Sequence, residues 1–443
     1  MNQNLFGTDG IRAKVGDFPL DLNSLILLGQ AIGLWAQKKY NNHFSVAIGN
    51  DTRKSCSFVK ATLKTGLLLN QTNLVDLHTI PTPGVFLFIQ QQIIDLGIVV
   101  SASHNPYQYN GIKLFDQKTG KISKEDEKTI TNFFYKLLSK KTTQKYEIFG
   151  TESQTEAQPH IPYFKILFDQ FEKSFLSGKK IILDCSYGAT YSLAPLIFET
   201  FNADVSCLNN KPDGKNINQN CGSTHPEKLQ EEVVKQKADI GFAFDGDGDR
   251  VVIVNRHGEL KDGDDILALL STHPHYKKEN AAVGTIMSNC GLEAFLENQN
   301  KKLIRTQVGD KHVAKALKEN NLSLGAEPSG HIICADYLNT GDGIFAALRV
   351  AETAALTNNW DLKTFEKYPQ INISLPVTEK KDLTTGALVK LISQAESKLT
   401  FGRTVVRYSG TEPILRVMVE EKTKQLAETV CAKLVKDLQK ELG

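Results

Sequence analysis

Residues 96–106 read LGIVVSASHNP, an apolar run that stops at a cluster of small polar side chains. Leu96 to Val100 have the length and composition of a strand buried on both faces. Two serines, a histidine and an asparagine–proline pair come directly after it, and such a set after a strand usually forms a turn. The loops after the other buried strands therefore decide whether this turn has a function.

The strand that ends in SASHNP is the third of a set, and the same order of elements recurs twice more along the chain. The sets are SVAIG (45–49), NLVDL (73–77) and LGIVV (96–100); KIILD (180–184), ADVSC (203–207) and DIGFAF (239–244); AAVGTI (281–286), KLIRT (302–306) and LSLGA (322–326). Spacers of helical length separate the strands within each set. This alternation predicts three mixed α/β domains with related connectivity.

The C-terminal part of the chain has a different pattern. Apolar runs at 371–375, 403–408 and 414–420, with a helical stretch at 385–398 and a final helix, predict a smaller α+β domain. In the final helix Leu426, Val430, Leu434 and Leu438 form one apolar stripe that should pack on the small sheet. The expected fold is α/β, with three related domains and the smaller C-terminal domain around a central cleft. We place their boundaries at 1–150, 151–252, 253–362 and 363–443.

Composition indicates an ordinary globular protein. The chain has 443 residues, 41% of them hydrophobic and 23% charged, with a formal net charge of +2. This balance predicts no nucleic-acid partner and no membrane attachment, and no apolar run reaches the length of a membrane span. Seven scattered cysteines without a C-x-x-C pair, and a start without a signal-peptide pattern, predict a cytoplasmic location.

Each third strand ends in an unusual polar loop. The three loops are SASHNP (101–106), DGDGDR (245–250) and EPSGH (327–331). Ligands of open α/β sheets bind beyond the carboxyl ends of the strands. We therefore expect the three loops to meet in the central cleft and to form one site.

The DGDGDR loop places Asp245, Asp247 and Asp249 at alternate positions. Two carboxylates about 4 Å apart repel by roughly 4 kcal/mol at an effective dielectric constant of 20. A divalent cation relieves that repulsion, and an all-oxygen ligand set favours Mg²⁺. A calcium EF-hand is excluded, because its required glycine and glutamate are replaced by Arg250 and Arg256. A solvated turn of aspartates is the alternative.

The SASHNP loop offers Ser101 and Ser103 as nucleophiles and His104 as a base or donor. A Ser-His-Asp hydrolase is one interpretation, but G-x-S-x-G is absent around both serines. The other is a serine that carries a phosphoryl group, which would explain why Arg250 stands beside a cation site. The chain also lacks G-x-x-x-x-G-K-[ST] and G-x-G-x-x-G, so a stored phosphoryl group is favoured over ATP as the donor.

The EPSGH loop carries Glu327, Ser329 and His331 among residues of little bulk. A carboxylate that accepts from vicinal hydroxyls orients a sugar, although the same residues also suit an ordinary turn.

Near the C-terminus, RYSGTEPILR (407–416) surrounds a hydroxyl-rich turn with arginines. Backbone amides and hydroxyls of such a turn, with two guanidinium groups, favour binding of a phosphate. The residues concerned are Arg407, Ser409, Gly410, Thr411 and Arg416.

Taken together, these motifs resemble the α-D-phosphohexomutase superfamily along the whole chain. The motifs that carry the resemblance, in order, are FGTDGIR (6–12), SASHNP (101–106), NGIK (110–113), DGDGDR (245–250), VGDKHV (308–313), GAEPSGH (325–331) and RYSGTEP (407–413). DCSYGATY (184–191), VGTIMSN (283–289) and the RVMVE that ends at 420 are most similar to the bacterial phosphoglucosamine mutase branch. Pro328 is a departure, since that branch often has a polar residue there.

The resemblance implies a role for each matching residue. Ser103 matches the phosphoserine, and its oxygen would complete a Mg²⁺ site with the three aspartates. Arg250 matches the residue beside that phosphate, while Glu327 and Ser329 match contacts to sugar hydroxyls. The remaining matches are Arg407, Ser409, Gly410 and Thr411 on the non-reacting phosphate, and Arg12, His104 and Lys113 near the transferring one, with Lys113 a candidate for proton transfer.

The implied reaction is the interconversion of glucosamine 6-phosphate and glucosamine 1-phosphate. It would proceed through phosphoserine 103 and glucosamine 1,6-bisphosphate, which serves as intermediate and activator, with one Mg²⁺ per chain. The expected ligand is a small hexosamine phosphate, the chain is a monomer or homodimer, and the product would supply amino-sugar nucleotide synthesis. A phosphomannomutase/phosphoglucomutase is the nearest alternative; a sugar-phosphate-binding regulator is the alternative without catalysis, and a metal-dependent hydrolase is less favoured.

Overall fold

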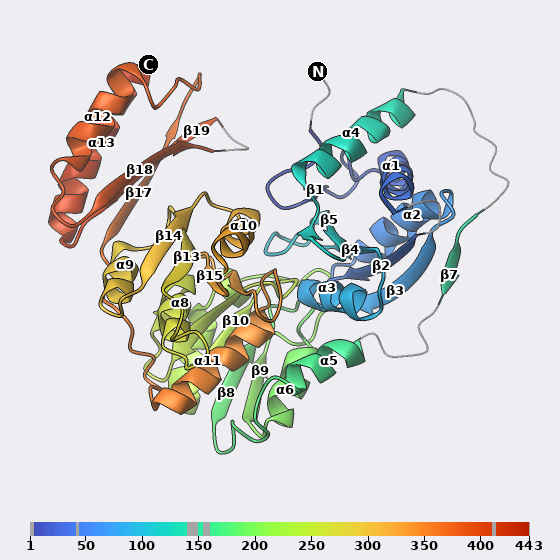
Figure 1. Ribbon diagram of the computed structural model, residues 1–443, viewed down its shortest axis with the longest axis horizontal. Helices are drawn as coiled ribbons and strands as arrows, with labels where there is room; N and C mark the ends of the chain where they lie inside the picture. The colour runs from blue at the N-terminus through green and yellow to red at the C-terminus, as the bar shows by residue number, and fades with distance from the viewer. Residues whose placement is uncertain (1–3, 41–43, 140–148, 154–159, 410–412, 443) are drawn as a thin grey trace.

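The computed structural model describes residues 4–40, 44–139, 149–153, 160–409 and 413–442. Four sheets, each with its own helices, succeed one another along the chain (Figure 1). The first three units are mixed α/β and the last is a smaller α+β unit, which confirms the predicted fold class. None of the helices in these ranges is long and apolar enough to cross a membrane.

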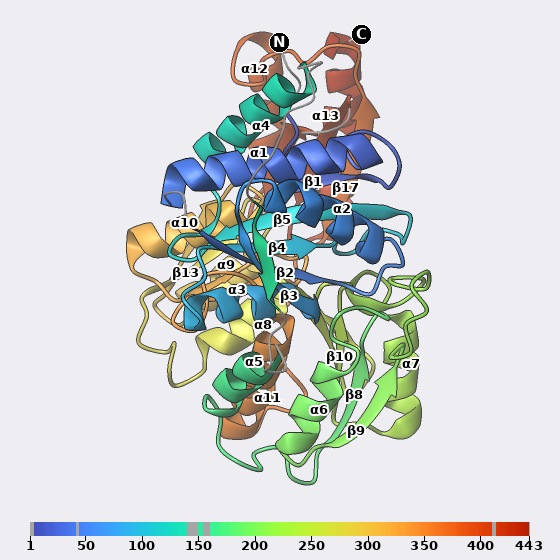
Figure 2. The same cartoon turned by 90° about the vertical axis from the view of Figure 1, so that its right-hand side faces the viewer.

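The first unit has a seven-stranded sheet in the order β1-β5-β4-β2-β3-β7, with β6 beside β5. Helices α1, α2 and α4 cover one face of this sheet, and α3 covers the other (Figure 2). Its elements are β1 (Ile11–Lys14), α1 (Leu22–Tyr40), β2 (Ser45–Asn50), α2 (Cys56–Leu68), β3 (Asn73–Thr79), α3 (Thr82–Gln91), β4 (Leu96–Val100), β5 (Tyr109–Asp116), β6 (Gly120–Lys121), α4 (Lys124–Leu138) and β7 (Thr151–Ser153).

The second unit has the sheet β12-β11-β10-β8-β9, and the third has β14-β13-β15-β16. The second comprises α5 (His160–Phe168), β8 (Lys180–Asp184), α6 (Leu193–Thr200), β9 (Asp204–Leu208), the 3₁₀ turn Gly222–Thr224, α7 (Glu227–Gln236), β10 (Ile240–Phe244), β11 (Val251–Asn255) and β12 (Leu260–Lys261). The third comprises α8 (Gly263–Ser271), β13 (Ala281–Thr285), α9 (Cys290–Glu297), β14 (Lys302–Thr306), α10 (Asp310–Asn320), β15 (Leu324–Ala326), β16 (Ile332–Cys334) and α11 (Gly343–Thr357).

The three predicted strand triplets share one topology. In each, the first strand is central, with the second on one side and the third on the other, all parallel. An antiparallel fourth strand then pairs with the third: β5 with β4, β11 with β10, and β16 with β15. This fourth strand was not predicted, and it turns each polar loop into a tight connection between two paired strands.

Two of the sheets end at other residues than the expected unit boundaries. The boundary expected at 252 falls inside β11, so the second sheet continues to β12. Similarly, β7 lies beyond the boundary expected at 150 and pairs in parallel with β3 of the first sheet. Periodicity does not reveal such pairings, because short strands carry little pattern of their own.

The C-terminal unit has the antiparallel sheet β17-β19-β18, backed by two helices. Its elements are β17 (Gln370–Pro376), α12 (Gly386–Glu396), β18 (Arg403–Tyr408), β19 (Ile414–Glu420) and α13 (Lys424–Leu442). Val430, Leu434 and Leu438 of the predicted stripe are buried in a core of this unit alone. By contrast, one continuous core joins the first three units, from Ala47 to Leu362.

Candidate active site

The three polar loops at the ends of the third strands come together. Ser103, after β4, donates its hydroxyl to Asp245 Oδ2 over 2.6 Å. The amide of Val251, at the end of the acidic loop, donates to the carbonyl of Gly330 over 3.0 Å. One loop from each α/β unit therefore contributes to the same site, as the sequence predicts.

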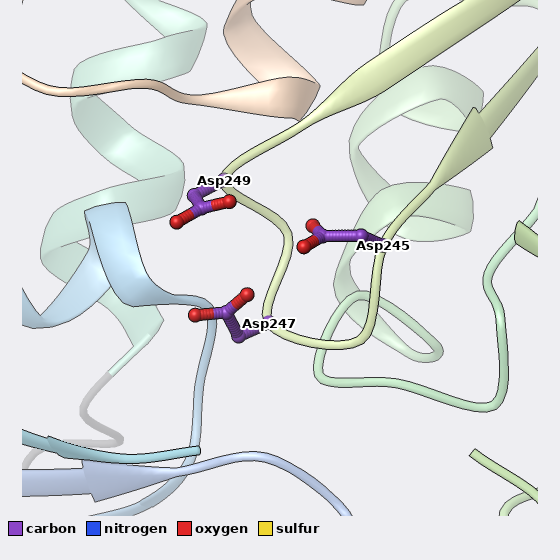
Figure 3. Close-up of side chains that lie close together, drawn as sticks. All are labelled: Asp245, Asp247 and Asp249. Carbon is purple, nitrogen blue, oxygen red and sulfur yellow. The ribbon is translucent and has the colours of Figure 1, made fainter. Parts of the chain in front are cut away.

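Asp245, Asp247 and Asp249 point toward a common centre from the single turn between β10 and β11 (Figure 3). All three are buried, and one oxygen from each lies within 4.8 Å of the others. Gly248 has a φ of +72°, a conformation that a side chain would strain. The glycines between the aspartates therefore allow the turn to present three carboxylates on one side.

Lys113 is the cation nearest to these carboxylates. It lies on β5, and its Nζ is 2.8 Å from both Asp247 Oδ2 and Asp249 Oδ2 and 3.1 Å from Asp9 Oδ2. Burial opposes the charge, but the aspartates outweigh it and hold the pKa of Lys113 well above its usual value. The ammonium of Lys113 thus neutralises part of the acidic cluster.

The remaining carboxylate oxygens fit a divalent cation. Asp247 Oδ1 and Asp249 Oδ1 are buried and have no hydrogen-bond partner among the described residues. Burial and then the charges of Asp249 and Asp247 raise the pKa of Asp245 well above its usual value, so its ionised form needs a further positive charge. Hard oxygen ligands of this kind, with Ser103 Oγ beside them, suit Mg²⁺.

The loop that carries Ser103 is held by a residue that the sequence motifs did not single out, Arg53. Its side chain is fully buried, and its Nε donates to Asp51 Oδ2 over 2.8 Å. The other donors bind the carbonyl oxygens of Ser103 (2.8 Å), Asn105 (2.7 Å), Pro106 (2.5 Å) and Tyr109 (3.1 Å). All three guanidinium nitrogens are therefore engaged in fixing this loop.

The two serines of the loop have different surroundings. Ser101 donates its hydroxyl to Asp51 Oδ2 over 2.5 Å and accepts the amide of Ser103 over 2.9 Å. Ser103 has a φ of +53°, an uncommon conformation for serine, and directs its hydroxyl at Asp245. Ser101 is thus a structural neighbour, and Ser103 is the serine that faces the acidic turn.

His104 lies beside Ser103, with its Nδ1 3.4 Å from the serine Oγ. Burial, then the charges of Arg250 and Arg12, lowers the pKa of His104 to about 4. His104 is therefore neutral at pH 7 and can accept a proton.

Arg12 and Arg250 bring positive charge to the site, and each has one donor without a hydrogen-bond partner among the described residues. Arg12, on β1, donates to Asp9 Oδ2 over 2.5 Å, and the side chain of Arg250 lies 3.7 Å from Asp249 Oδ1. The Nε of each is buried and has no hydrogen-bond partner within the described chain. Two orphaned guanidinium donors near Ser103 favour an anion at this point.

The side chains of the EPSGH loop differ in exposure, since Ser329 is exposed whereas Glu327 and His331 are buried. Glu327 accepts the amide of Gly309 over 2.9 Å, and Ser329 is exposed. His331 is buried, accepts the amide of Gly341 at Nε2 over 3.0 Å and places Nδ1 3.7 Å from Asp249 Oδ1. This position favours support of the acidic turn over the sugar contact predicted for His331.

Arg407 and Arg416 lie directly opposite each other on β18 and β19. They line a cavity of about 230 Å³ together with Ser374 of β17. Burial and then the charge of the neighbouring Arg416 lower the pKa of Arg407. Ser409 is buried at the end of β18, whereas the predicted Gly410 and Thr411 lie outside the described residues.

Sequence reasoning missed several residues that build the site. Besides Arg53 and Asp51, they include Thr82, whose hydroxyl donates to Asp247 Oδ2 over 2.5 Å, and Asn218, which donates to the carbonyl of Ser103 over 2.8 Å. The only signal for Arg53 was the position of DTR (51–53) directly after β2, at the same sheet edge as SASHNP. Contacts between separate segments leave no local pattern.

Family models match all four units of the chain. They are the phosphoglucomutase/phosphomannomutase alpha/beta/alpha domains I, II and III, at residues 3–141, 160–258 and 262–368, and the C-terminal domain of the same family at 373–437.

Curated relatives match along nearly the whole chain. A phosphoglucosamine mutase of Hydrogenovibrio crunogenus is 41% identical over 441 residues, which covers 97% of both proteins. One from Campylobacter curvus is 38% identical over 436 residues, with 96% of both covered.

Solved structures show that the fold is shared. A phosphoglucomutase/phosphomannomutase family protein of Burkholderia thailandensis superposes with a TM-score of 0.80 at 22% identity, covering 99% of this chain and 97% of that one. The N-acetylphosphoglucosamine mutase of Aspergillus fumigatus, in complex with GlcNAc-6P and magnesium, gives a TM-score of 0.69 at 16% identity, covering 99% and 96%. At these identities the likeness concerns the fold alone.

Proposed function

The chain belongs to the phosphoglucomutase/phosphomannomutase family, and from this membership we propose that it interconverts glucosamine 6-phosphate and glucosamine 1-phosphate. The relatives that match it over their whole length are phosphoglucosamine mutases, which supports the hexosamine as substrate. We further propose that it acts in the cytoplasm as a monomer or homodimer and supplies amino-sugar nucleotide synthesis.

The observation that carries the proposal is the 2.6 Å hydrogen bond between Ser103 Oγ and Asp245 Oδ2. Ser103 would hold a phosphoryl group, and Asp245, Asp247 and Asp249 would hold Mg²⁺ beside it. Bound there, the ion would neutralise charge on the phosphoryl group as it moves between oxygens. The orphaned Nε atoms of Arg12 and Arg250 support the same role for these arginines.

In the first step the phosphoryl group passes from Ser103 Oγ to the free hydroxyl of the sugar phosphate. The P–O bond to serine breaks, a P–O bond to the sugar forms, and the hydroxyl proton ends on the serine oxygen. His104, neutral and 3.4 Å from Ser103 Oγ, is suited to relay that proton. Lys113 was one candidate for proton transfer, but the aspartates hold its pKa well above its usual value, which favours an electrostatic role.

The second step requires the bisphosphate to turn over in the cleft, so that its other phosphate returns to Ser103. Arg407 and Arg416 would hold whichever phosphate is not reacting, and Glu327 and Ser329 would contact sugar hydroxyls. Such positioning contributes much of the rate in phosphoryl transfer, where the protein does little covalent chemistry.

Two measurements test the proposal. Intact-mass analysis of freshly purified protein should show a fraction with one added phosphoryl group, which is lost in Ser103→Ala; a phosphate mapped to another residue would contradict the assignment. Parallel assays with glucosamine, glucose and mannose 6-phosphates should give the highest kcat/KM with glucosamine 6-phosphate. Preference for glucose or mannose would make the protein a phosphoglucomutase/phosphomannomutase, and tight binding without turnover would make it a regulator.

A further inference from the structure

The start of α11 lies directly against the acidic turn, although α11 belongs to the third unit (Figure 3). The amide of Gly343, the first residue of α11, donates to the carbonyl of Gly248 over 3.0 Å. The amide of Gly341 donates to His331 Nε2 over 3.0 Å, and Nδ1 of that imidazole lies 3.7 Å from Asp249 Oδ1. Two amides of one short loop therefore support the turn that carries the aspartates.

The loop approaches the turn too closely for side chains. A Cβ atom on Gly341 would lie 2.5 Å from the carbonyl oxygen of Asp249, and one on Gly343 would lie 2.6 Å from that of Arg250. Both distances are shorter than van der Waals contact, so the two backbones can pack in this way only because the loop has glycine at both positions. A shift of the loop would therefore be transmitted directly to the turn.

The residue between the two glycines, Asp342, holds the loop in place and is only 2% exposed. Its Oδ1 accepts the amide of Phe345 over 3.0 Å and so caps the N-terminus of α11. The hydroxyl of Tyr163 lies 2.9 Å from Oδ1 and 3.1 Å from Oδ2, and that of Tyr337 donates to Oδ2 over 3.0 Å. Since Tyr163 comes from α5 of the second unit, the carboxylate joins two units.

Only neutral donors hold the carboxylate of Asp342, and it forms no ion pair with any described residue. Burial raises the pKa of Asp342 to about 6, while the amide of Phe345 and the two tyrosine hydroxyls oppose this rise. Buried carboxylates are ordinarily paired with a cation, because burial of an unpaired charge is costly. The exception is explained if the carboxylate is needed to order the loop on which it lies.

We propose that Asp342 is a positioning residue for the acidic turn: held by two tyrosine hydroxyls, it fixes the amides of the adjacent glycines and, through them, Asp249. The inference rests on the proposed function in one respect, namely that the acidic turn binds a divalent cation. Asp342 does not belong to the group of carboxylates that could hold the ion. Its replacement should therefore weaken the metal site without removing a ligand.

Mn²⁺ titration followed by electron paramagnetic resonance measures the effect on the resting protein, without turnover. Asp342→Asn should weaken Mn²⁺ binding about tenfold, the lower end of the range for residues that orient metal ligands from outside. Asparagine is also a good N-cap, so this variant retains the start of α11 while it loses an oxygen that accepts a tyrosine hydroxyl. Tyr163→Phe, which removes one hydroxyl alone, should weaken binding about threefold.

Tyr276→Phe is the matched control. The side chain of Tyr276 is fully buried and donates its hydroxyl to Asp336 of the third unit over 3.2 Å, but it makes no hydrogen bond with the acidic turn in the described chain. The control loses a similar contact, and its Mn²⁺ affinity should stay within about twofold of the unsubstituted protein. Equal weakening in this control would attribute the effect to general destabilisation and overturn the proposal.

A double variant tests whether the tyrosine acts through the carboxylate. Once Asp342→Asn is present, adding Tyr163→Phe should weaken Mn²⁺ binding by less than about twofold; a further loss of about threefold would contradict the coupling. Where Asp342→Asn does not fold, Tyr163→Phe and Tyr337→Phe decide the question by themselves. Unchanged affinity in all single variants would overturn this inference while the metal site stands, and absence of Mn²⁺ binding by the unsubstituted protein would overturn both.

Discussion

Replacing Arg53 tests how far the serine loop depends on one buried side chain. Arg53→Lys keeps the positive charge but offers a single nitrogen where the guanidinium engages four backbone carbonyls and Asp51. Arg53→Met keeps the approximate bulk but removes the charge. The two variants therefore separate the loss of the fork geometry from the loss of the ion pair.

The contacts set the expected magnitudes. Arg53→Met leaves Asp51 buried without its cation, and breaking such a buried pair costs about 3–5 kcal/mol. Arg53→Lys retains a partner for Asp51 and loses at least two charged hydrogen bonds, which corresponds to about 3–6 kcal/mol. If the loop shifts by about 1 Å, turnover should fall roughly a hundredfold, since in-line transfer requires accurate placement of Ser103.

Two tryptophans simplify the stability assay. Trp35 is buried in α1 of the first unit, and Trp360 lies in the segment after α11. In a Trp360→Phe background, the fluorescence of Trp35 during urea titration reports the unfolding of the first unit. Turnover and the phosphorylated fraction are measured on the same samples, and Mn²⁺ binding reports whether the acidic turn, which belongs to the second unit, remains folded.

Arg256→Lys is the matched control, since Arg256 is exposed and forms ion pairs with Asp239 at 3.2 Å and with Asp361 at 3.7 Å. It should alter stability by less than about 1 kcal/mol and leave turnover unchanged. Turnover in Arg53→Lys within threefold of the unsubstituted protein would refute the inference that this guanidinium positions Ser103. A cost below about 1 kcal/mol in Arg53→Met would refute the energetic reasoning.

Three further substitutions have defined outcomes. Asp247→Asn should weaken Mn²⁺ binding, measured by electron paramagnetic resonance, at least about a hundredfold; unchanged affinity would rule out the acidic turn as the metal site. Arg407→Ala should raise KM about 10–100-fold with little change in kcat, and a fall in kcat alone would contradict a docking role. Burial and then Asp262 raise the pKa of Asp264 to about 7, so the folded state binds a proton that the unfolded state has released. The free energy of unfolding should therefore fall by about 4 kcal/mol as pH rises from about 4 to 7, and it should level off above pH 7. Urea titrations at pH 5 and 8 measure this decline, which should be smaller in Asp264→Asn. An equal decline in that variant would exclude Asp264 as the cause.

The local sequence was sufficient for the three strands of each α/β unit and for the character of the loops that follow them. Buried strands such as Leu96–Val100 are recognisable because continuous apolar runs occur where both faces of a sheet are covered. The alternating carboxylates of the DGDGDR loop, together with its glycines, already favoured a cation site. These features depend on residues adjacent in the chain, so their composition alone reveals them.

The tertiary structure decided which segments share the site and what each side chain contacts there. Arg53 holds a loop about 50 residues further on, and Lys113 joins one unit to the carboxylates of another. His331 belongs to the predicted EPSGH loop, yet it is buried and places Nδ1 3.7 Å from Asp249 Oδ1. Contacts of this kind depend on how the sheets pack against one another, and burial and charge result from that packing, so a linear motif does not specify them.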